Sequence, residues 1–182
     1  MVLLESINLP MGSKAHNFKL PGIDEAEHSL DDYSDAKVLV LVFMCNHCPY
    51  VQGVIDRLIK LQEDFKDKGV QFVGINANES DNYPEDSFEK MPEYAKEWGL
   101  NFPYLRDESQ EVAKVYQAQC TPDIFVFDNE RKLAYHGRID DNWQHEDQVT
   151  KEELKEALSA LINGEKVAEK QNPSMGCSIK WK

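Results

Sequence analysis

The sequence predicts an α/β domain with a central mixed β-sheet and helices on both faces. Two continuous apolar runs, at residues 38–44 and 70–77, are typical of strands that are buried on both faces. Between them, apolar residues recur at helical spacing from Val51 to Phe65. Strands that alternate with helices form parallel sheets, and a later hairpin adds antiparallel strands.

Shorter elements are expected around this central unit. Residues 17–30 have the pattern of a short extended pair that turns at Pro21 and Gly22. Residues 78–100 carry a helical apolar face, and Pro92 within it predicts a break or a kink. We therefore expect an N-terminal strand-pair extension and an irregular helix after the second buried strand.

Two later helices are predicted from their capping residues. Asp107 is expected to open the first helix, with Gln110 three positions after it. Thr150 is expected to open the second helix, with Glu153 completing a capping box. Gly164 is expected to end this second helix.

A β-hairpin and a tail complete the chain. Residues 123–127 and 132–139 are expected to form two strands joined by a turn at residues 128–131. Residues 165–182 show no periodicity and are expected to form a C-terminal tail. A chain of 182 residues and 20.9 kDa fits one domain, which we place at residues 1–164, before that tail.

Charge and composition exclude some classes of function. The 20 Lys and Arg residues are outnumbered by 33 Asp and Glu residues, which gives a net charge of −13. An acidic surface disfavours nucleic acid and anionic membranes as partners. The N-terminal apolar run Val2–Leu4 is much shorter than a secretory signal or a membrane span. We therefore expect no nucleic-acid or membrane partner and a cytoplasmic location.

The segment Cys45-Asn46-His47-Cys48 lies between the first buried strand and the helix that follows it. A cysteine at a helix N-terminus faces unpaired N–H groups, which stabilise its thiolate and lower its pKa. The C-x-x-C spacing lets the second sulfur reach the first. We expect Cys45 to attack as the first and more exposed thiol, and Cys48 to resolve the mixed disulfide.

The two residues between the cysteines are expected to modulate the pair. A protonated His47 would favour the Cys45 thiolate and make the disulfide more oxidising. The alternative is that His47 is a solvated turn residue. Asn46 is the other residue between the two cysteines. Asn46 and His47 are therefore candidate modulating residues.

Two other uses of the cysteines are open. The pair could be a buried structural pair, or it could belong to a zinc site. The possible zinc ligands are Cys45, His47, Cys48, Cys120 and Cys177. Because no second C-x-x-C or H-x-x-H follows, we predict neither a metal nor another bound cofactor.

The CNHC motif and the segment 102–140 resemble the thioredoxin superfamily, in its peroxiredoxin-like and redoxin branch of the AhpC/TSA type. The resemblance covers residues 15–163 and implies a thioredoxin-like fold. In that superfamily a loop ending in Thr-Pro precedes a strand, and its proline is cis and packs beside the C-x-x-C. The resemblance therefore implies a cis bond before Pro122 and a role in substrate binding for Thr121 and Pro122.

Three positions depart from the patterns of that superfamily. Val42 stands where peroxiredoxins carry a threonine, three residues before the reactive cysteine. Leu39 and Met44 stand where thioredoxins carry a buried acid and a tryptophan. The sequence is therefore neither a standard peroxiredoxin nor a standard thioredoxin.

The other two cysteines are candidate auxiliary thiols. Cys120 precedes Pro122 by two residues and is either a small buried residue or a third redox partner. Cys177 lies in the tail. Either the tail is disordered, or it docks through Ile179 and Trp181 and brings Cys177 into exchange.

Together these patterns favour an enzyme, a thiol–disulfide oxidoreductase that uses Cys45 and Cys48 to reduce or exchange substrate disulfides. One alternative is a thiol-dependent peroxidase in which Cys45 is peroxidatic. Another is a non-enzymatic redox-sensing or zinc-binding module. The expected partners are a disulfide- or peroxide-containing substrate and an electron donor, either a dithiol protein or a thioredoxin reductase system.

Overall fold

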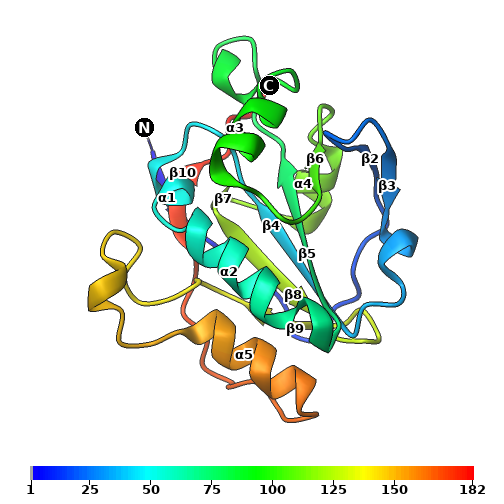
Figure 1. Ribbon diagram of the computed structural model, residues 1–182, viewed down its shortest axis with the longest axis vertical. Coiled ribbons are helices and arrows are strands. Elements are labelled where there is room, and N and C mark those ends of the chain that lie inside the picture. Colours follow the sequence, from blue (N-terminus) through cyan, green and yellow to red (C-terminus); the bar gives the residue numbers. More distant parts are fainter. Residues whose placement is uncertain (1) are drawn as a thin grey trace.

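The computed structural model describes residues 2–182 and is organised around a five-stranded mixed sheet (Figure 1). Its strands are β4 Val38–Phe43, β5 Val70–Asn76, β6 Tyr104–Arg106, β8 Asp123–Phe127 and β9 Leu133–His136. They lie in the order β6-β5-β4-β8-β9. The first three pair in parallel, whereas β8 and β9 pair antiparallel to their neighbours. The predicted mixed sheet is confirmed.

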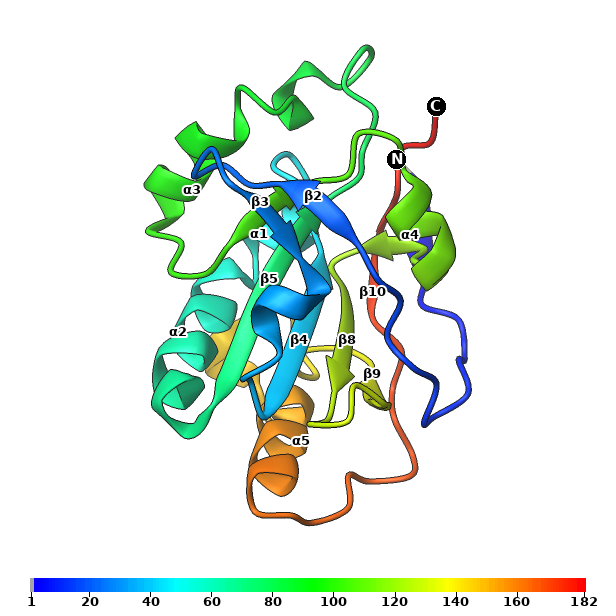
Figure 2. The same cartoon turned by 90° about the vertical axis from the view of Figure 1, so that its right-hand side faces the viewer.

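Alternate residues of β4 pack against different layers. The helices are α1 Pro49–Gln52, α2 Ile55–Phe65, α3 Met91–Trp98, α4 Glu111–Tyr116 and α5 Glu153–Ile162. Val40 and Val42 share a buried cluster with residues of α2, α3 and α5. Leu39 and Leu41 share another with residues of α4 and the N-terminal strands. Helices therefore cover both faces of the sheet (Figure 2). Within residues 2–182, no helix has the length and apolar character needed to span a membrane.

The expected N-terminal strand pair is attached to one edge of the sheet. β2 (Lys19–Pro21) and β3 (Glu27–Ser29) are antiparallel. Gly22 follows β2 in the turn and forms a bridge to Leu105 of β6. This bridge joins the pair to β6, the edge strand of the central sheet.

The helix predicted after the CNHC motif is split into α1 and α2 at Gly53. A Cβ at Gly53 would lie 2.9 Å from the carbonyl oxygen of Trp143, so the approach of the loop 140–149 requires glycine here. Arg57 holds this loop, because its guanidinium pairs with Asp140 and donates to the carbonyl oxygen of Trp143 at 2.8 Å.

The predicted opening of the helix at Asp107 is wrong. α4 begins at Glu111, and Gln110 precedes it in a left-handed conformation with φ of 64°. The Asp107 carboxylate still serves the helix, because it accepts a hydrogen bond from the backbone N–H of Ala113 at 2.8 Å. A capping box joins residues that are three positions apart, so the contact of Asp107 with Ala113, six positions later, could not be predicted from that pattern.

The capping box predicted at Thr150 is also wrong. α5 begins at Glu153, and the Thr150 hydroxyl donates to Asp141 at 2.5 Å. The Glu153 carboxylate pairs with Arg138 at 2.6 Å. Both side chains find partners outside the helix, and these contacts replace the local cap.

Pro92 lies in the first turn of α3 and does not kink it. A proline is tolerated there because the first N–H groups of a helix have no partner within the helix. The residues before it, from position 78, form loops and the short 3-10 turn η3 (Pro84–Asp86).

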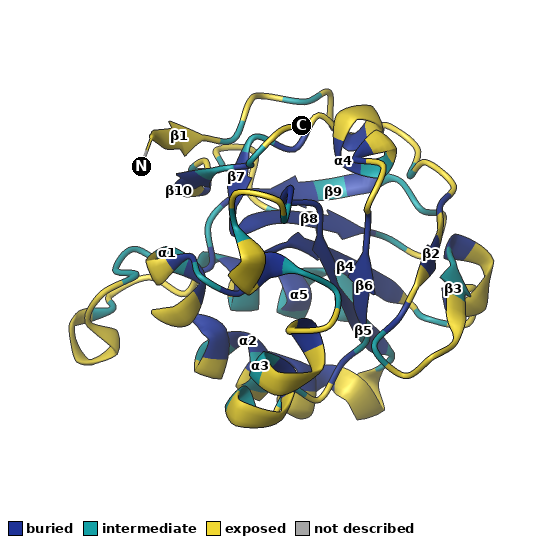
Figure 3. Ribbon diagram, turned by 90° about the horizontal axis from the view of Figure 1, so that it is seen from above, coloured by how far each residue is buried: buried dark blue, intermediate teal, exposed yellow. Residues whose placement is uncertain are grey.

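The end of the chain forms a strand that the sequence did not predict. β10 (Met175–Ser178) lies between β1 (Leu3–Glu5) and β7 (Cys120–Thr121) and is antiparallel to both (Figure 3). A strand of four residues has no readable periodicity, and its partners lie far away in the sequence. The segment expected as a tail, residues 165–182, therefore contains a strand that packs onto the rest of the chain.

Candidate functional site

The CNHC segment connects the end of β4 to α1. Cys48 is the N-cap of α1, whose first residue is Pro49, so Cys45 lies before the helix. The relative exposure of Cys45 is 1% and that of Cys48 is 0%. The helix N-terminus is therefore occupied by Cys48 and not by Cys45, and both sulfurs are buried, so exposure does not distinguish them. Position alone does not make Cys45 the better nucleophile.

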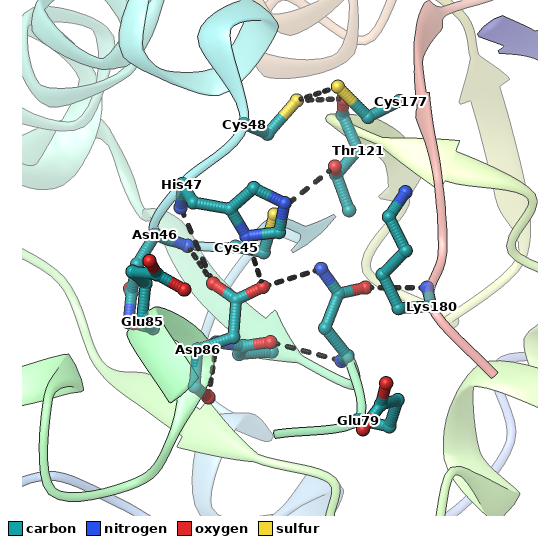
Figure 4. A network of polar contacts seen from close by, with 12 residues as sticks. Cys45, Asn46, His47, Cys48, Glu79, Glu85, Asp86, Thr121, Cys177 and Lys180 are labelled. Atoms are coloured by element: carbon teal, nitrogen blue, oxygen red, sulfur yellow. Dashed lines mark hydrogen bonds and ion pairs between the residues drawn. The ribbon is translucent and has the colours of Figure 1, made fainter. Parts of the chain in front are cut away.

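Thr121 faces both cysteines from the segment that leads into β8. The peptide bond between Thr121 and Pro122 is cis. The Thr121 hydroxyl lies 3.4 Å from the Cys45 sulfur, and its carbonyl oxygen lies 3.1 Å from the Cys48 sulfur (Figure 4). The structure thus brings Thr121 and Pro122 to the cysteine pair.

A pocket of about 290 Å³ lies next to Pro122. Tyr50, Trp143 and Met175 contribute to its wall. The rings of Tyr50 and Trp143 are in contact, with centroids 4.0 Å apart and planes tilted by 30°. Arg138, which the sequence did not place, also lines this pocket. The pocket offers aromatic surface beside the cysteine loop.

The two auxiliary cysteines differ in what they contact. The Cys177 sulfur lies 2.9 Å from the Cys48 sulfur, which is longer than a disulfide bond of about 2.05 Å. The Cys120 sulfur lies 3.6 Å from the carbonyl oxygen of Pro122, and burial raises its pKa. Cys120 therefore has the environment of a small buried residue, whereas Cys177 lies against Cys48.

The pKa values of the two cysteines of the motif are shifted in opposite directions. Hydrogen bonding from the Cys45 thiol, together with that from Cys177, lowers the pKa of Cys48 to about 5. Burial raises the pKa of Cys45 well above its ordinary value, and the shared hydrogen bond with Cys48 adds to this. These opposite directions favour loss of the Cys48 proton before the Cys45 proton.

The thiolate of the reduced protein is expected to persist at neutral pH. Its ultraviolet absorbance should fall as the pH falls through about 5, because protonation of Cys48 removes it. Cys48→Ser should remove this transition. Cys45→Ser should move the transition to higher pH, since a hydrogen bond to the thiolate is lost. Cys120→Ser is the matched control. A wild-type transition confined to the ordinary thiol pKa of 9.0 would contradict the assignment.

Asp86, at the end of η3, is the centre of a polar network beneath the motif (Figure 4). Its buried carboxylate accepts hydrogen bonds from the backbone N–H of Asn46 at 2.7 Å and from Asn78 Nδ2 at 2.6 Å. His47 Nδ1 lies 2.7 Å from the same carboxylate. Burial alone would raise the pKa of Asp86, but the hydrogen bonds from His47 and Asn78 outweigh it and lower the pKa. Sequence reasoning missed Asp86, because nothing in its acidic surroundings marks one carboxylate as buried.

His47 is directed at Asp86. The hydrogen bond to Asp86 raises the pKa of His47, and the negative charge at Cys48 adds to this rise. Its ring also stacks on Tyr83, with centroids 5.4 Å apart. A His47 ring nitrogen and the Cys45 sulfur lie within 4.8 Å of each other, so a charged His47 lies beside the thiol that the sequence expected it to activate.

Asn46 anchors the loop between the cysteines. It is fully buried. Its side chain donates to the carbonyl oxygen of Glu85 at 2.7 Å and accepts a hydrogen bond from the Tyr104 hydroxyl at 2.9 Å. Both ends of the amide are thus used to hold the motif against η3 and β6.

The zinc ligands that the sequence allowed do not form one group. Within residues 2–182, the donors close enough to share a metal are Cys45, His47 and Asp86, all within 4.8 Å of one another. The other three cysteines lie outside this set. His47 and Asp86 already form an ion pair in it, which joins two of the three donors directly.

Comparison with known proteins supplies the family. Residues 11–136, more than half of the chain, match the family described as AhpC/TSA. The chain belongs to the AhpC/TSA family. Among curated proteins, the thiol-disulfide oxidoreductase ResA of Geobacillus kaustophilus is 29% identical over 124 residues, which cover 68% of this chain and 67% of ResA.

Two solved structures are similar to this AhpC/TSA family member. An uncharacterized conserved protein from Geobacillus kaustophilus has a TM-score of 0.95 at 46% identity, covering 100% of this chain and 97% of the other. The thioredoxin domain of a thiol-disulfide oxidoreductase from Bacteroides vulgatus has a TM-score of 0.61 at 20% identity, covering 71% and 89%. The fold is thioredoxin-like, as the resemblance implied. With the ResA relatives, the comparisons identify the chain as an oxidoreductase.

Proposed function

We propose that this protein reduces or exchanges substrate disulfides through the Cys45/Cys48 pair. The observation that carries the proposal is the position of both cysteines against the cis bond before Pro122: the Thr121 hydroxyl lies 3.4 Å from the Cys45 sulfur, and the Thr121 carbonyl oxygen lies 3.1 Å from the Cys48 sulfur. A thiolate is the nucleophile in disulfide exchange, and a neighbouring thiol can resolve the mixed disulfide. The relatives named thiol-disulfide oxidoreductase support the same type of reaction.

The proposed order of attack begins at Cys48. Its thiolate attacks one sulfur of the substrate disulfide, so that bond breaks and a Cys48–substrate disulfide forms. The other substrate sulfur leaves as a thiolate and takes up a proton. Cys45 then loses its proton and attacks the Cys48 sulfur, which forms the Cys45–Cys48 disulfide and releases the second substrate thiol. This order is the reverse of the one expected from the sequence.

Thr121 and Pro122 are the proposed substrate-binding residues. Thr121 contacts both reacting sulfurs, and Pro122 lines the adjoining pocket. The aromatic walls that Tyr50 and Trp143 give this pocket fit an apolar side chain close to the substrate cysteine. The proposed substrate is therefore a disulfide-bonded peptide or protein.

Turnover requires an electron donor that reduces the Cys45–Cys48 disulfide again. The pair itself carries the two electrons, so no bound cofactor enters these steps. A dithiol protein or a thioredoxin reductase system takes this role in the proposal. The cytoplasmic location expected from the sequence stays a prediction.

The proposal is tested by mixing the prereduced protein with insulin in the absence of any other reductant. We expect one insulin disulfide to be lost for each protein molecule oxidised, counted as new insulin thiols after an acid quench. Cys120→Ser, which keeps the pair, is the matched control and should react as the wild type does. If no insulin thiols appear while hydrogen peroxide is consumed, the peroxidase alternative replaces the proposal.

A further inference from the structure

We propose that Cys177 is a third redox-active thiol and that strand β10 presents it to Cys48 as an internal substrate strand. The inference rests on the proposed function of the Cys45/Cys48 pair. It gives Cys177, which lies outside the C-x-x-C motif, a part in the exchange reaction, and it gives β10 the role of holding Cys177 at Cys48.

The backbone of β10 pairs with the segment that leads into the cis proline. Cys177 pairs antiparallel with Thr121, and Ser178 pairs with Cys120. A Cβ at Gly176 would lie 2.0 Å from the carbonyl oxygen of Thr121. The strand therefore approaches the segment before the cis proline as closely as it does because residue 176 is glycine.

The contacts on both sides of β10 hold it in place. On its outer edge it pairs with β1, and the Ser178 N–H donates to the carbonyl oxygen of Val2 at 2.8 Å. Beyond the strand, the Lys180 N–H donates to Asn78 Oδ1 at 2.9 Å (Figure 4). Ile179, between them, is 3% exposed and belongs to the core under α4. The segment is therefore part of the folded domain.

The sulfur atoms are arranged for exchange. The Cys48 sulfur lies 2.9 Å from the Cys177 sulfur, and Cys45, its partner in the C-x-x-C motif, is near enough to interact with it. Cys48 therefore has one thiol neighbour in the motif and another in β10, while Cys120 is directed at the carbonyl oxygen of Pro122. A disulfide at Cys48 can pass between its two neighbours with small movements of the side chains.

The proposed step starts from the Cys45–Cys48 disulfide that reduction of a substrate disulfide leaves behind. Cys177 loses its proton and attacks the Cys48 sulfur. The Cys45–Cys48 bond breaks and the Cys48–Cys177 bond forms. Cys45 leaves as a thiolate and takes up the proton, so the step needs no outside oxidant or reductant. The disulfide then ties β10 to the start of α1.

The test is to map the disulfide of the oxidised protein. Prereduced protein is oxidised with one molar equivalent of insulin or of diamide, its remaining thiols are alkylated, and tryptic peptides are analysed by mass spectrometry. Cys45 and Cys48 share the fragment 38–57, and Cys177 lies on the fragment 171–180. We expect these two fragments to be joined, with Cys45 alkylated.

Four variants sharpen this test. Diamide should still join the two fragments in Cys45→Ser and in the matched control Cys120→Ser, but not in Cys48→Ser. Gly176→Val should lower the yield of joined fragments several-fold, because a side chain there meets Thr121. An unchanged yield in Gly176→Val would contradict the role of the strand, provided that its circular dichroism matches the wild type.

The inference and the proposed function can fail separately. If the wild type reduces insulin but holds only a disulfide closed within fragment 38–57, and diamide leaves both thiols of Cys45→Ser alkylated, Cys177 is not redox-active. If the fragments become joined with diamide while insulin is never reduced, the exchange at Cys177 stands and the proposed function fails.

Discussion

Replacing Cys48 by serine is expected to abolish the reduction of insulin disulfides, with a fall in rate of at least about 10³-fold. A serine hydroxyl stays protonated at neutral pH, so the variant lacks the thiolate that starts exchange. The hydroxyl can still donate to the carbonyl oxygen of Thr121, which the Cys48 sulfur contacts at 3.1 Å, so the fold should be retained. The measurement is the rate of insulin reduction with dithiothreitol as recycling reductant, after subtraction of the uncatalysed rate.

The order of attack is decided by trapping the mixed disulfide. A variant with serine at both Cys45 and Cys177 keeps the attacking sulfur and loses the two thiols that lie next to it. It should accumulate an adduct of Cys48 with an insulin chain, visible as an increase in mass. Cys120→Ser should turn over without an adduct. An adduct on Cys45 in the Cys48→Ser variant would contradict attack by Cys48 and restore the order expected from the sequence.

The central sheet and the place of the CNHC cysteines at the end of β4 could be predicted from the sequence because their signals are local. β4 is a continuous apolar run that is fully buried, and the CNHC motif follows it directly. The Thr121-Pro122 dipeptide stands before the strand β8. Loops at the ends of adjacent strands lie close together, and β4 and β8 are adjacent. The meeting of these two segments therefore follows from the order of the strands.

The surroundings of the sulfurs could not be predicted, because they depend on contacts between distant segments. Asp86 lies about forty positions after the motif and is one of several acidic residues in its neighbourhood. The strand β10 follows its partner β7 by more than fifty residues and contains a glycine, which weakens any strand pattern. Sequence reasoning could see neither the burial of Cys45 nor the thiol of Cys177 beside Cys48.

Replacing Asp86 by alanine is expected to lower the free energy of unfolding by about 3–5 kcal/mol. The carboxylate is fully buried and pairs with His47, so its removal leaves a charged group without its partner. It also leaves the Asn46 N–H and the Asn78 amide without acceptors inside the protein. Denaturant unfolding of the reduced protein measures the loss. Glu85→Ala is the matched control, because it removes the neighbouring exposed carboxylate and keeps the Glu85 carbonyl oxygen that Asn46 uses.

The loss should depend on pH in a way that identifies the ion pair. Asp86 has a lowered pKa, so its contribution to stability is present above its unfolded pKa and is lost as the pH falls through the folded value. His47 has a raised pKa, so its contribution is present below its unfolded pKa and is lost as the pH rises through the folded value. The difference in the free energy of unfolding between wild type and Asp86→Ala should therefore be largest at pH values above the unfolded-state pKa of Asp86 and below the unfolded-state pKa of His47. A difference below about 1 kcal/mol throughout, the size of one ordinary hydrogen bond, would show that the pair does not anchor the motif.

The isosteric variant Asp86→Asn separates the charge of the residue from its shape. The negative charge of Asp86 is one cause of the raised pKa of Cys45. An amide removes that charge, so the pKa of Cys45 should fall, and that of His47 should fall as well. The two cysteines would then compete more evenly for the single proton, and the ultraviolet transition of the thiolate should broaden. The NMR titration of His47 shows whether its pKa has fallen. If it has fallen and the ultraviolet transition of the thiolate is unchanged, the charge of Asp86 does not influence which cysteine is deprotonated.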